Sequence, residues 1–239
     1  MASGKNTSER VYDTIRNMAI DYEFRPDENI NESLLAAQLG VSRTPVRDAL
    51  NKLINEGLIV FRSNRGFFCR SLSADELLHL AEVRLGLEKL ALELALARGT
   101  DQQRKDLLQF WSDVDARIPS LTTREIARLD EQFHERIFQM TENTILLGMI
   151  QQINARVRFV RQIDIEQPMR KGADFKEHFN IARALIERKD KEAMEALTRH
   201  LTFTADDAVK ALREGLVRIF LKDSRSLDRQ FGREVTPSA

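Results

Sequence analysis

Apolar side chains follow a helical period along most of the chain and a strand-like pattern in only one place. Within the first 70 residues the spacing predicts three helices: residues 8–22, a short helix ended by Gly40, and a third ended by Gly57. Two β-prone runs follow, residues 58–61 and 67–70, and the turn between them contains Asn and Gly. The pattern therefore predicts three helices and a β-hairpin in this part of the chain.

From residue 74 to about residue 222 the pattern is helical, and no run is a convincing strand. Turn-forming residues divide this region into six predicted helices with short connections, as in a helical bundle. Their ranges are 74–98, 101–118, 122–141, 144–163, 173–188 and 190–221. The predicted fold class is mostly α: a winged helix-turn-helix of three helices and a β-hairpin, joined to an all-α helical bundle.

The domain boundaries are expected where these patterns change. The chain has 239 residues, which is long enough for two domains. We expect the first domain over residues 1–70 and the helical domain over residues 71–222. Residues 223–239 are polar and contain Gly and Pro, so we expect a mobile tail.

The third predicted helix has two contrasting faces. Its apolar stripe consists of Val46, Ala49, Leu50, Leu53 and Ile54. Arg43, Arg47 and Asn51 recur at four-residue steps on another face, and Ser42 or Thr44 can cap the first turn. A helix that buries one face and presents two Arg and an Asn on another is suited to reading an external partner. Arg can donate to O6 and N7 of guanine together, so the expected partner is double-stranded DNA.

The charge distribution agrees with a local nucleic-acid contact. Lys plus Arg and Asp plus Glu both number 37, so the whole chain has no net charge. Residues 1–42 contain four basic and seven acidic side chains, a net charge of −3. Residues 43–70 contain six basic and two acidic side chains, a net charge of +4. Positive charge is therefore concentrated on the third helix and the hairpin, which fits an oriented phosphate contact rather than general binding of polyanions.

Composition excludes several other classes. Hydrophobic residues make up 42% of the chain and charged residues 31%, and no apolar run is long enough to span a membrane. The N-terminus lacks the apolar core of a secretory signal. The single cysteine, Cys69, rules out an internal disulfide. We therefore expect a cytoplasmic protein without a membrane partner, associated with the nucleoid when bound to DNA.

Three of the four histidines fall on apolar stripes of the predicted helical domain. Asp130 and His134 stand at i and i+4 of one helix, while His178 and His200 lie on the stripes of two others. A buried carboxylate is costly without a partner, and one carboxylate with three imidazoles is the composition of a metal site. The sequence therefore predicts a divalent metal held by these four residues, with zinc, nickel, manganese and iron all open. His79 has no such partner and is interpreted as structural.

The N-terminal region resembles the DNA-binding domain of GntR-family bacterial transcription regulators. The resemblance rests on the string from Ser42 to Leu50, on Leu53, on Glu56-Gly57-Leu58 and on the Gly66 turn. It implies that Arg43 and Arg47 approach guanines and phosphates in the major groove. It also implies that the wing tip, which contains Asn64, Arg65 and Gly66, enters the adjacent minor groove.

The helical region resembles the FCD effector domain of the FadR-like branch of the same family. The similar motifs are Arg84-x-x-x-Glu88, Asp130-x-x-Phe133-His134, Glu177-His178 and Arg199-His200. In the metal-binding members an Asp and three His hold a divalent ion, and a small organic acid binds at or beside it. The resemblance implies this arrangement for Asp130, His134, His178 and His200, and it argues against a fatty-acyl ligand.

Three residues are candidates for holding a small carboxylate effector. Arg84 lies on a buried stripe, where it can bind a carboxylate or pair with Glu88 one turn later. Arg156 also follows an apolar stripe, but the neighbouring Arg158 and Arg161 indicate a solvated basic face. Asn143 is either a polar contact to the effector or a residue that joins two helices.

The expected function is a transcription regulator that binds an inverted-repeat operator as a homodimer and is controlled by a small organic acid at the metal; repressor is the expected type, with activator left open. One alternative is a metal-dependent hydrolase, because three His and an Asp can activate water. No spare general base stands out, however, so no catalytic residue is predicted and the protein is not expected to be an enzyme. The other alternative is an architectural DNA-binding protein with a purely structural metal, whose DNA affinity is indifferent to small acids.

Overall fold

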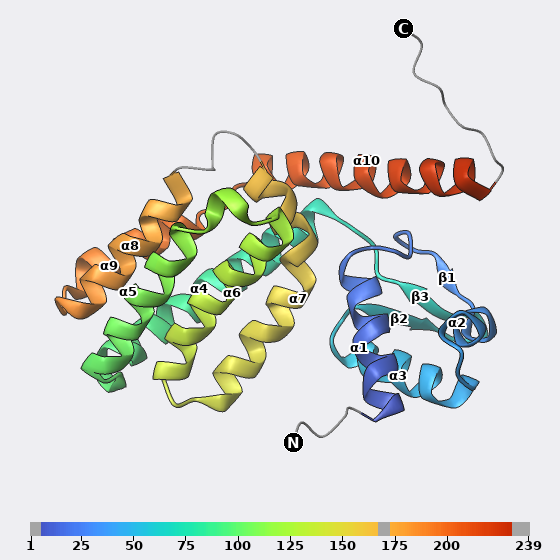
Figure 1. Cartoon of the computed structure of the whole chain (residues 1–239), viewed down its shortest axis with the longest axis horizontal. Coiled ribbons are helices and arrows are strands. Elements are labelled where there is room, and N and C mark those ends of the chain that lie inside the picture. The colour runs from blue at the N-terminus through green and yellow to red at the C-terminus, as the bar shows by residue number, and fades with distance from the viewer. Residues whose placement is uncertain (1–5, 167–172, 231–239) are drawn as a thin grey trace, which may run out of the picture. The chain divides into compact units, whose positions relative to one another are not determined.

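The computed structural model describes residues 6–166 and 173–230, with side chains described for residues 6–166 and 175–221. The chain divides into two compact units: the first combines residues 1–72 with residues 210–239, and the second is residues 73–209. Figure 1 shows the strands gathered in the first unit and the helices α4 to α9 gathered in the second. The predicted fold class, mostly α with a winged helix-turn-helix and a helical bundle, is confirmed.

The winged helix-turn-helix contains three helices and a small antiparallel sheet. The sheet has the strand order β1-β3-β2, and Val60 of β2 pairs with Phe68 of β3. The sequence pattern missed strand β1, which is only two residues long and pairs with β3 through Asn29 and Phe68. The elements are α1 (Thr7–Ile20), β1 (Asn29–Ile30), α2 (Glu32–Leu39), α3 (Arg43–Asn55), β2 (Ile59–Arg62) and β3 (Gly66–Cys69).

The turn between α2 and α3 fixes how α3 is presented. Gly40 ends α2 with a φ of 66°, a left-handed conformation that glycine adopts without a steric penalty. The side chain of Asn31 caps the other end of α2 by accepting hydrogen bonds from two backbone N–H groups, both at 3.0 Å. Val46, Leu50 and Leu53 are fully buried, as the apolar stripe of α3 predicts. The opposite face of α3 is thereby left exposed.

The second unit is a bundle of helices around one apolar core. Its largest buried side chain is Trp111, whose ring makes an edge contact with Phe133 at 5.3 Å between centroids. Helices α8 and α9 pack side by side, as do α6 and α7 (Figure 1). The helices are α4 (Ala74–Arg98), α5 (Asp101–Asp115), α6 (Thr123–Met140), α7 (Thr144–Glu166), α8 (Ala173–Ile186) and α9 (Asp190–Leu201), with a 3₁₀ turn η1 (Ile118–Ser120).

The predicted helix over residues 190–221 is wrong, because it is two helices. Helix α9 ends at Leu201, and α10 (Ala205–Gln230) begins four residues later. Thr204 and Asp207 form a capping box at this start: the Thr204 hydroxyl accepts from the Asp207 N–H at 3.2 Å, and the Asp207 carboxylate accepts from the Thr204 N–H at 3.0 Å. The T-x-x-D signature is present in the sequence, but the helical spacing that predicted one helix runs across Thr204 without a break.

The end of the chain also differs from the expectation. Helix α10 continues to Gln230, which lies within the tail predicted over residues 223–239. Residues 231–239 of that predicted tail lie outside the described residues. Among the described helices, none combines the length and apolar composition needed to cross a membrane.

Candidate metal centre and DNA-reading surface

Three helices bring the predicted ligand set together. Asp130 and His134 come from α6, His178 from α8 and His200 from the last turn of α9. One donor atom from each of these four residues lies within 4.8 Å of the other three. All four side chains are almost completely buried. His200 is the last residue but one of α9, which ends at Leu201.

The separations between donor atoms suit a single ion. The Nε2 atoms of His134 and His200 are 3.1 Å apart, and Nε2 of His178 is 3.0 Å from Oδ1 of Asp130. Nε2 of His200 is 3.9 Å from the same oxygen. Ligands about 2.0–2.2 Å from one metal are separated by roughly 3.0–3.6 Å in tetrahedral or adjacent octahedral positions. The first two separations lie within this range and the third is longer, so the donor chemistry and most of the spacing fit a divalent cation.

Neighbouring side chains orient the histidines. Nδ1 of His134 lies 2.8 Å from the carboxylate of the fully buried Glu88 on α4, so the Nδ1–H donates and Nε2 is free to bind a metal. The indole of Trp111 stacks on the His178 ring at 3.8 Å between centroids and 15° between planes. The Trp111 N–H in turn donates to the Phe175 carbonyl oxygen at 3.0 Å. The sequence analysis gave Glu88 only as a partner of Arg84.

The ionisation states also suit metal binding. Burial raises the pKa of Asp130, but the positive charge of Arg161 and the hydrogen bond from His178 outweigh it and hold that pKa well below its ordinary value. Burial and the neighbouring histidines lower the pKa of His200 well below its ordinary value, and burial lowers that of His134. At pH 7 these shifts favour an ionised Asp130 and neutral His134 and His200, the forms that bind a cation.

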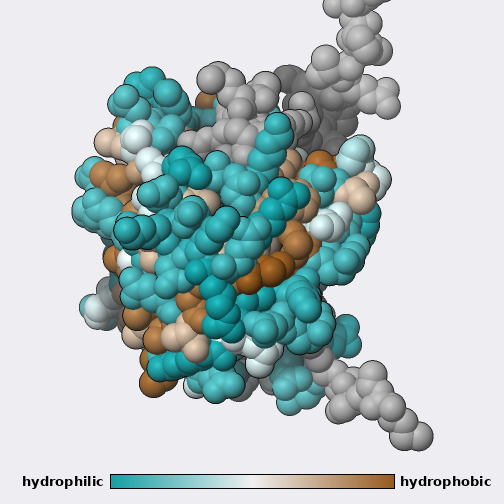
Figure 2. Space-filling view, turned by 90° about the vertical axis from the view of Figure 1, so that its left-hand side faces the viewer, coloured by the Kyte–Doolittle hydropathy of each residue, from teal (hydrophilic) through white to brown (hydrophobic). Residues whose placement is uncertain are grey.

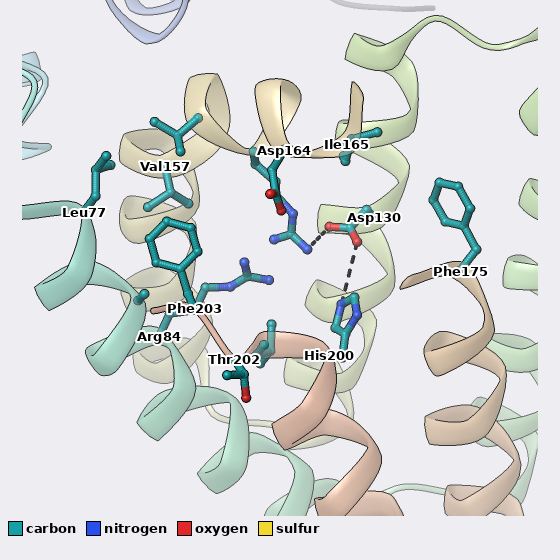
Figure 3. A pocket seen from close by; sticks show the side chains of 14 residues that line it. Leu77, Arg84, Asp130, Val157, Asp164, Ile165, Phe175, His200, Thr202 and Phe203 are labelled. Atoms are coloured by element: carbon teal, nitrogen blue, oxygen red, sulfur yellow. Dashed lines mark ion pairs between the residues drawn. The ribbon is translucent and has the colours of Figure 1, made fainter. Parts of the chain in front are cut away.

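A pocket opens beside the cluster. Its volume is about 100 Å³, enough for several water molecules or for an organic acid of a few carbon atoms. In Figure 3, Arg84 and Asp164 point toward the space that Asp130 and His200 also face, while Leu77, Val157 and Phe203 line another side. Polar groups at one end and apolar side chains around the rest are typical of a small-molecule site.

Two arginines in this pocket carry buried positive charge. Arg161 forms an ion pair with Asp130, drawn as one of the dashed lines in Figure 3, and Arg84 pairs with Glu88 at 3.3 Å. Each guanidinium side chain is only 11% exposed. The interpretation of Arg161 as part of a solvated basic face was therefore wrong. The only signal in the sequence was the apolar Val157 one helical turn before Arg161.

The other effector candidates lie elsewhere. Arg156 pairs with Glu76 and does not line the pocket. The Asn143 side chain accepts a hydrogen bond from the Leu146 N–H at 3.1 Å and so caps α7, which is the helix-joining role. The structure therefore brings only Arg84, of the three candidates, to the pocket. His79 is exposed and is not a member of the cluster.

The first unit presents the residues predicted to read DNA. Arg43 and Arg47 lie on the exposed face of α3 with side chains 60% and 57% exposed. Ser42 stands at the N-cap of α3 without a capping hydrogen bond from its side chain. Thr44 and Asn51 are exposed on the same helix. Five of the predicted DNA contacts are therefore available on one element.

The wing tip is also exposed. Asn64 and Arg65 are accessible, and Asn64 and Gly66 adopt the left-handed conformation with φ of 60° and 87°. The Asn29 side chain donates a hydrogen bond to the Arg65 carbonyl oxygen at 2.8 Å, which ties the turn to strand β1. The turn therefore holds Arg65 at a fixed place in the hairpin with its side chain exposed.

Sequence analysis missed one residue of this surface, Glu32. This residue is the first of α2, and its carboxylate accepts hydrogen bonds from Nε and Nη2 of Arg47 at 2.7 and 3.0 Å. It also lies 3.7 Å from Nη2 of Arg43. No pattern within α3 points to this partner, because the contact joins residues 15 positions apart across the turn.

A winged helix-turn-helix with exposed arginines on its third helix, followed by an all-helical unit, is the arrangement of a class of DNA-binding transcription regulators. Comparison with known proteins agrees. The model of the bacterial regulatory proteins of the gntR family matches residues 7–69, and the model of the FCD domain matches residues 79–203. The chain belongs to the GntR family and carries an FCD domain, as the sequence motifs predicted.

Relatives extend over nearly the whole chain. The Nta operon transcriptional regulator of Aminobacter aminovorans is 38% identical over 209 residues, which cover 87% of this chain and 98% of the relative. The transcriptional repressor GlaR of Escherichia coli strain K12 is 29% identical and covers 82% and 92% of the two chains. The solved structure of E. coli McbR/YncC has a TM-score of 0.67 at 18% identity, covering 91% of this chain and 99% of that one, which shows the shared fold.

The class of protein follows from these findings. The matched families and the relatives are transcription regulators, so the prediction that the protein is not an enzyme is confirmed, and the hydrolase alternative is excluded.

Proposed function

We propose that this regulator binds an inverted-repeat operator as a homodimer and responds to a small organic acid that binds at a divalent metal. The observation that carries the proposal is the convergence of Asp130 and three histidines next to a pocket that contains Arg84 and Arg161. DNA binding by the first unit does not require a buried cluster of three imidazoles and a carboxylate in the second unit, so this cluster indicates a separate role.

The metal is held by Asp130, His134, His178 and His200. A bound divalent cation supplies a Lewis-acid anchor for an anionic oxygen. Imidazole suits zinc, nickel and iron, and the carboxylate also accepts manganese, so the ligand set leaves these four metals open. Glu88 fixes the tautomer of His134, which keeps that ring ready for the ion.

The buried charges favour an anionic effector. Arg84 and Arg161 balance Glu88 and Asp130, so a divalent cation adds two positive charges that Asp164 at the pocket wall offsets only in part. Nη1 of Arg161 is buried and has no hydrogen-bond partner among the described residues. A carboxylate placed between the metal and Arg161 satisfies both. The small volume of the pocket favours an acid of a few carbon atoms.

The homodimer is supported by apolar side chains exposed on two helices that pack together. Val83 and Leu90 of α4 are 53% and 44% exposed, and Ile145 and Met149 of α7 are 73% and 50% exposed. We assign this surface to a second copy of the chain, because a homodimer with two-fold symmetry binds the two halves of an inverted-repeat operator. Figure 2, a view of the side that lies at the left of Figure 1, shows mostly hydrophilic side chains with hydrophobic ones in patches between them.

Effector binding is expected to change DNA affinity through a shift between two arrangements of the dimer. A ligand shifts this equilibrium only by its difference in affinity for the two arrangements. Because relatives such as GlaR are named repressors, repression is the direction we propose for this regulator.

The metal proposal is tested on purified protein after treatment with a chelator. Trp111 is the only tryptophan and stacks on His178, so its fluorescence reports on the site. Titration with Zn²⁺, Ni²⁺ or Mn²⁺ is expected to change the emission with a one-to-one end point. His134→Ala with His178→Ala should abolish the change, and His79→Ala, at an exposed histidine, should retain it. A double variant that still binds one metal per chain places the site elsewhere.

The effector proposal is tested by a thermal-shift screen of small carboxylates with and without metal. Acids that bind at the metal raise the melting temperature only of the metal-loaded protein, and they should change its affinity for DNA. If the acids stabilise the protein but leave its DNA affinity unchanged, the alternative of an architectural DNA-binding protein is correct instead.

The operator and dimer proposals are tested together. A duplex selected by the protein from a random pool serves as the operator, and Arg47→Ala should abolish specific binding without a change in helical content. The same selection should return an inverted repeat. Val83→Glu with Met149→Glu should convert the dimer to a monomer in light scattering and weaken operator binding; a dimer that persists overturns the α4–α7 interface.

A further inference from the structure

The contact between Glu32 and Arg47 is arranged so that one edge of the guanidinium is occupied and the other is open. Nε and Nη2 both donate to the Glu32 carboxylate, which uses the side edge of the group. A guanidinium has five N–H donors in a plane, and its far edge, formed by Nη1 and Nη2, is a second two-pronged fork. That fork matches the N7 and O6 acceptors of guanine.

Burial distinguishes the two partners. The Glu32 side chain is only 14% exposed, while that of Arg47 is 57% exposed. The Glu32 carboxylate is therefore held in the protein at the first turn of α2, and the Arg47 guanidinium faces the solvent. A long Arg side chain loses rotamer freedom when it binds DNA, and a carboxylate that already holds it removes part of that cost.

The same carboxylate acts on the charge of the surface. Arg43 and Arg47 together carry two positive charges, and Glu32 reduces the net charge of the three side chains to one. Non-specific affinity for DNA depends on the number of phosphates that are neutralised. The negative charge of Glu32 beside α3 therefore weakens contacts with phosphate. The free Nη1–Nη2 edge of Arg47 can still reach the edge of a base.

The geometry points to Glu32 as a positioning residue for specificity: it holds Arg47 by the side edge for end-on recognition of a guanine and disfavours non-specific phosphate contacts. The inference rests on the DNA-reading role of α3. It assigns to Glu32 two opposite effects, a gain in specific binding and a loss in non-specific binding, which no general role in stability produces.

The test compares Glu32→Gln with wild type on two duplexes of equal length, the selected operator and a shuffled version of it. Specific affinity is expected to fall about tenfold, since part of a bidentate base contact is lost. Non-specific affinity is expected to rise, and its dependence on salt to steepen by about one phosphate equivalent.

Asp48→Asn is the matched control. Asp48 is exposed on α3 next to Arg47, and it forms no ion pair among the described residues, so this variant makes the same change of charge without touching the contact. It should shift specific and non-specific affinity in the same direction. If Glu32→Gln also changes the two affinities in parallel, Glu32 acts only as a charge and the inference is overturned.

A second measurement identifies the base. Replacing each operator guanine in turn by 7-deazaguanine removes the N7 acceptor, and one position should cause a loss for wild type and a smaller loss for Arg47→Lys, whose ammonium donates without a planar fork. Glu32→Gln should reduce the loss at that same position. An unchanged loss shows that Glu32 does not position Arg47, whereas a wild-type protein that selects no operator at all contradicts the DNA-reading role itself.

Discussion

Both units of this regulator pair arginines with carboxylates, but they do so in opposite surroundings. On α3, Arg47 is 57% exposed and is held by Glu32 at 2.7 Å. In the helical unit, Arg84 is 11% exposed and is held by Glu88, which is fully buried, at 3.3 Å. The arginine of the pair is thus accessible to an outside partner in one unit and enclosed in the other.

The difference teaches what each pair can do. In the exposed pair the far edge of the Arg47 guanidinium is open to water, so DNA can bind that edge while Glu32 keeps the side edge. A buried pair cannot lose a partner without leaving an uncompensated charge in a poorly solvated interior. The exposed pair therefore suits recognition of a large polyanion, and the buried pairs suit a site that accepts only an ion or ligand of matching charge.

The largest effect is expected from breaking the buried contact of Arg161. Arg161→Ala leaves Asp130 without its strongest positive neighbour and should lower the free energy of unfolding by about 3–5 kcal/mol in chelator-treated protein. Chemical denaturation followed by Trp111 fluorescence measures the change.

Glu32→Ala is the comparison for this measurement, because it deletes a member of an ion pair on the surface. We expect its denaturation midpoint to stay close to that of wild type. Metal addition should restore part of the stability of Arg161→Ala, since a cation also compensates Asp130. If the two variants lose the same free energy of unfolding, burial does not determine how much each ion pair contributes to stability.

The same contrast explains what the sequence could predict. Asp130 and His134 were paired from their i, i+4 spacing, and His178 and His200 from their apolar stripes, because a polar residue on a buried stripe is conspicuous in one sequence. The exposed Arg43 and Arg47 were found from the contrasting faces of α3. Each of these signals lies within a single helix.

Contacts between elements were harder to predict. Glu88 with His134, Arg161 with Asp130 and Glu32 with Arg47 each join two helices, and periodicity within one helix carries no information about its neighbour. The break between α9 and α10 was missed for a different reason. The apolar spacing continues across Thr204, so the capping signal competed with a periodic pattern and was overlooked.

A smaller effect is expected from Glu88, which acts on the metal through His134. Glu88→Gln keeps the size of the side chain but weakens its hold on the His134 N–H, and metal affinity should fall about 10–100-fold. Competition with a chromogenic chelator measures the affinity. Glu93→Gln, at an exposed position on the same helix, should bind metal as wild type does. If both variants bind equally tightly, the buried carboxylate has no part in the site.

The smallest effect concerns a pair that lies between the two extremes, Tyr12 and Glu56. The hydroxyl of Tyr12 donates to the Glu56 carboxylate across α1 and the end of α3. Partial burial, together with the hydrogen bond to that carboxylate and its negative charge, raises the pKa of Tyr12 from 10.0 to about 12.

The sign of the linkage follows from this direction. Because the folded pKa lies above the unfolded one, the stabilisation is complete below pH 10 and is lost as the pH rises from 10 toward 12. The chain has two tyrosines, so tyrosinate absorbance in a Tyr22→Phe background isolates Tyr12. Glu56→Gln should lower the pKa toward 10, because the carboxylate is lost while the burial remains. If Tyr12 ionises near pH 10 in the folded protein with Glu56 present, the carboxylate has little effect on its pKa. The pair then behaves like an exposed one.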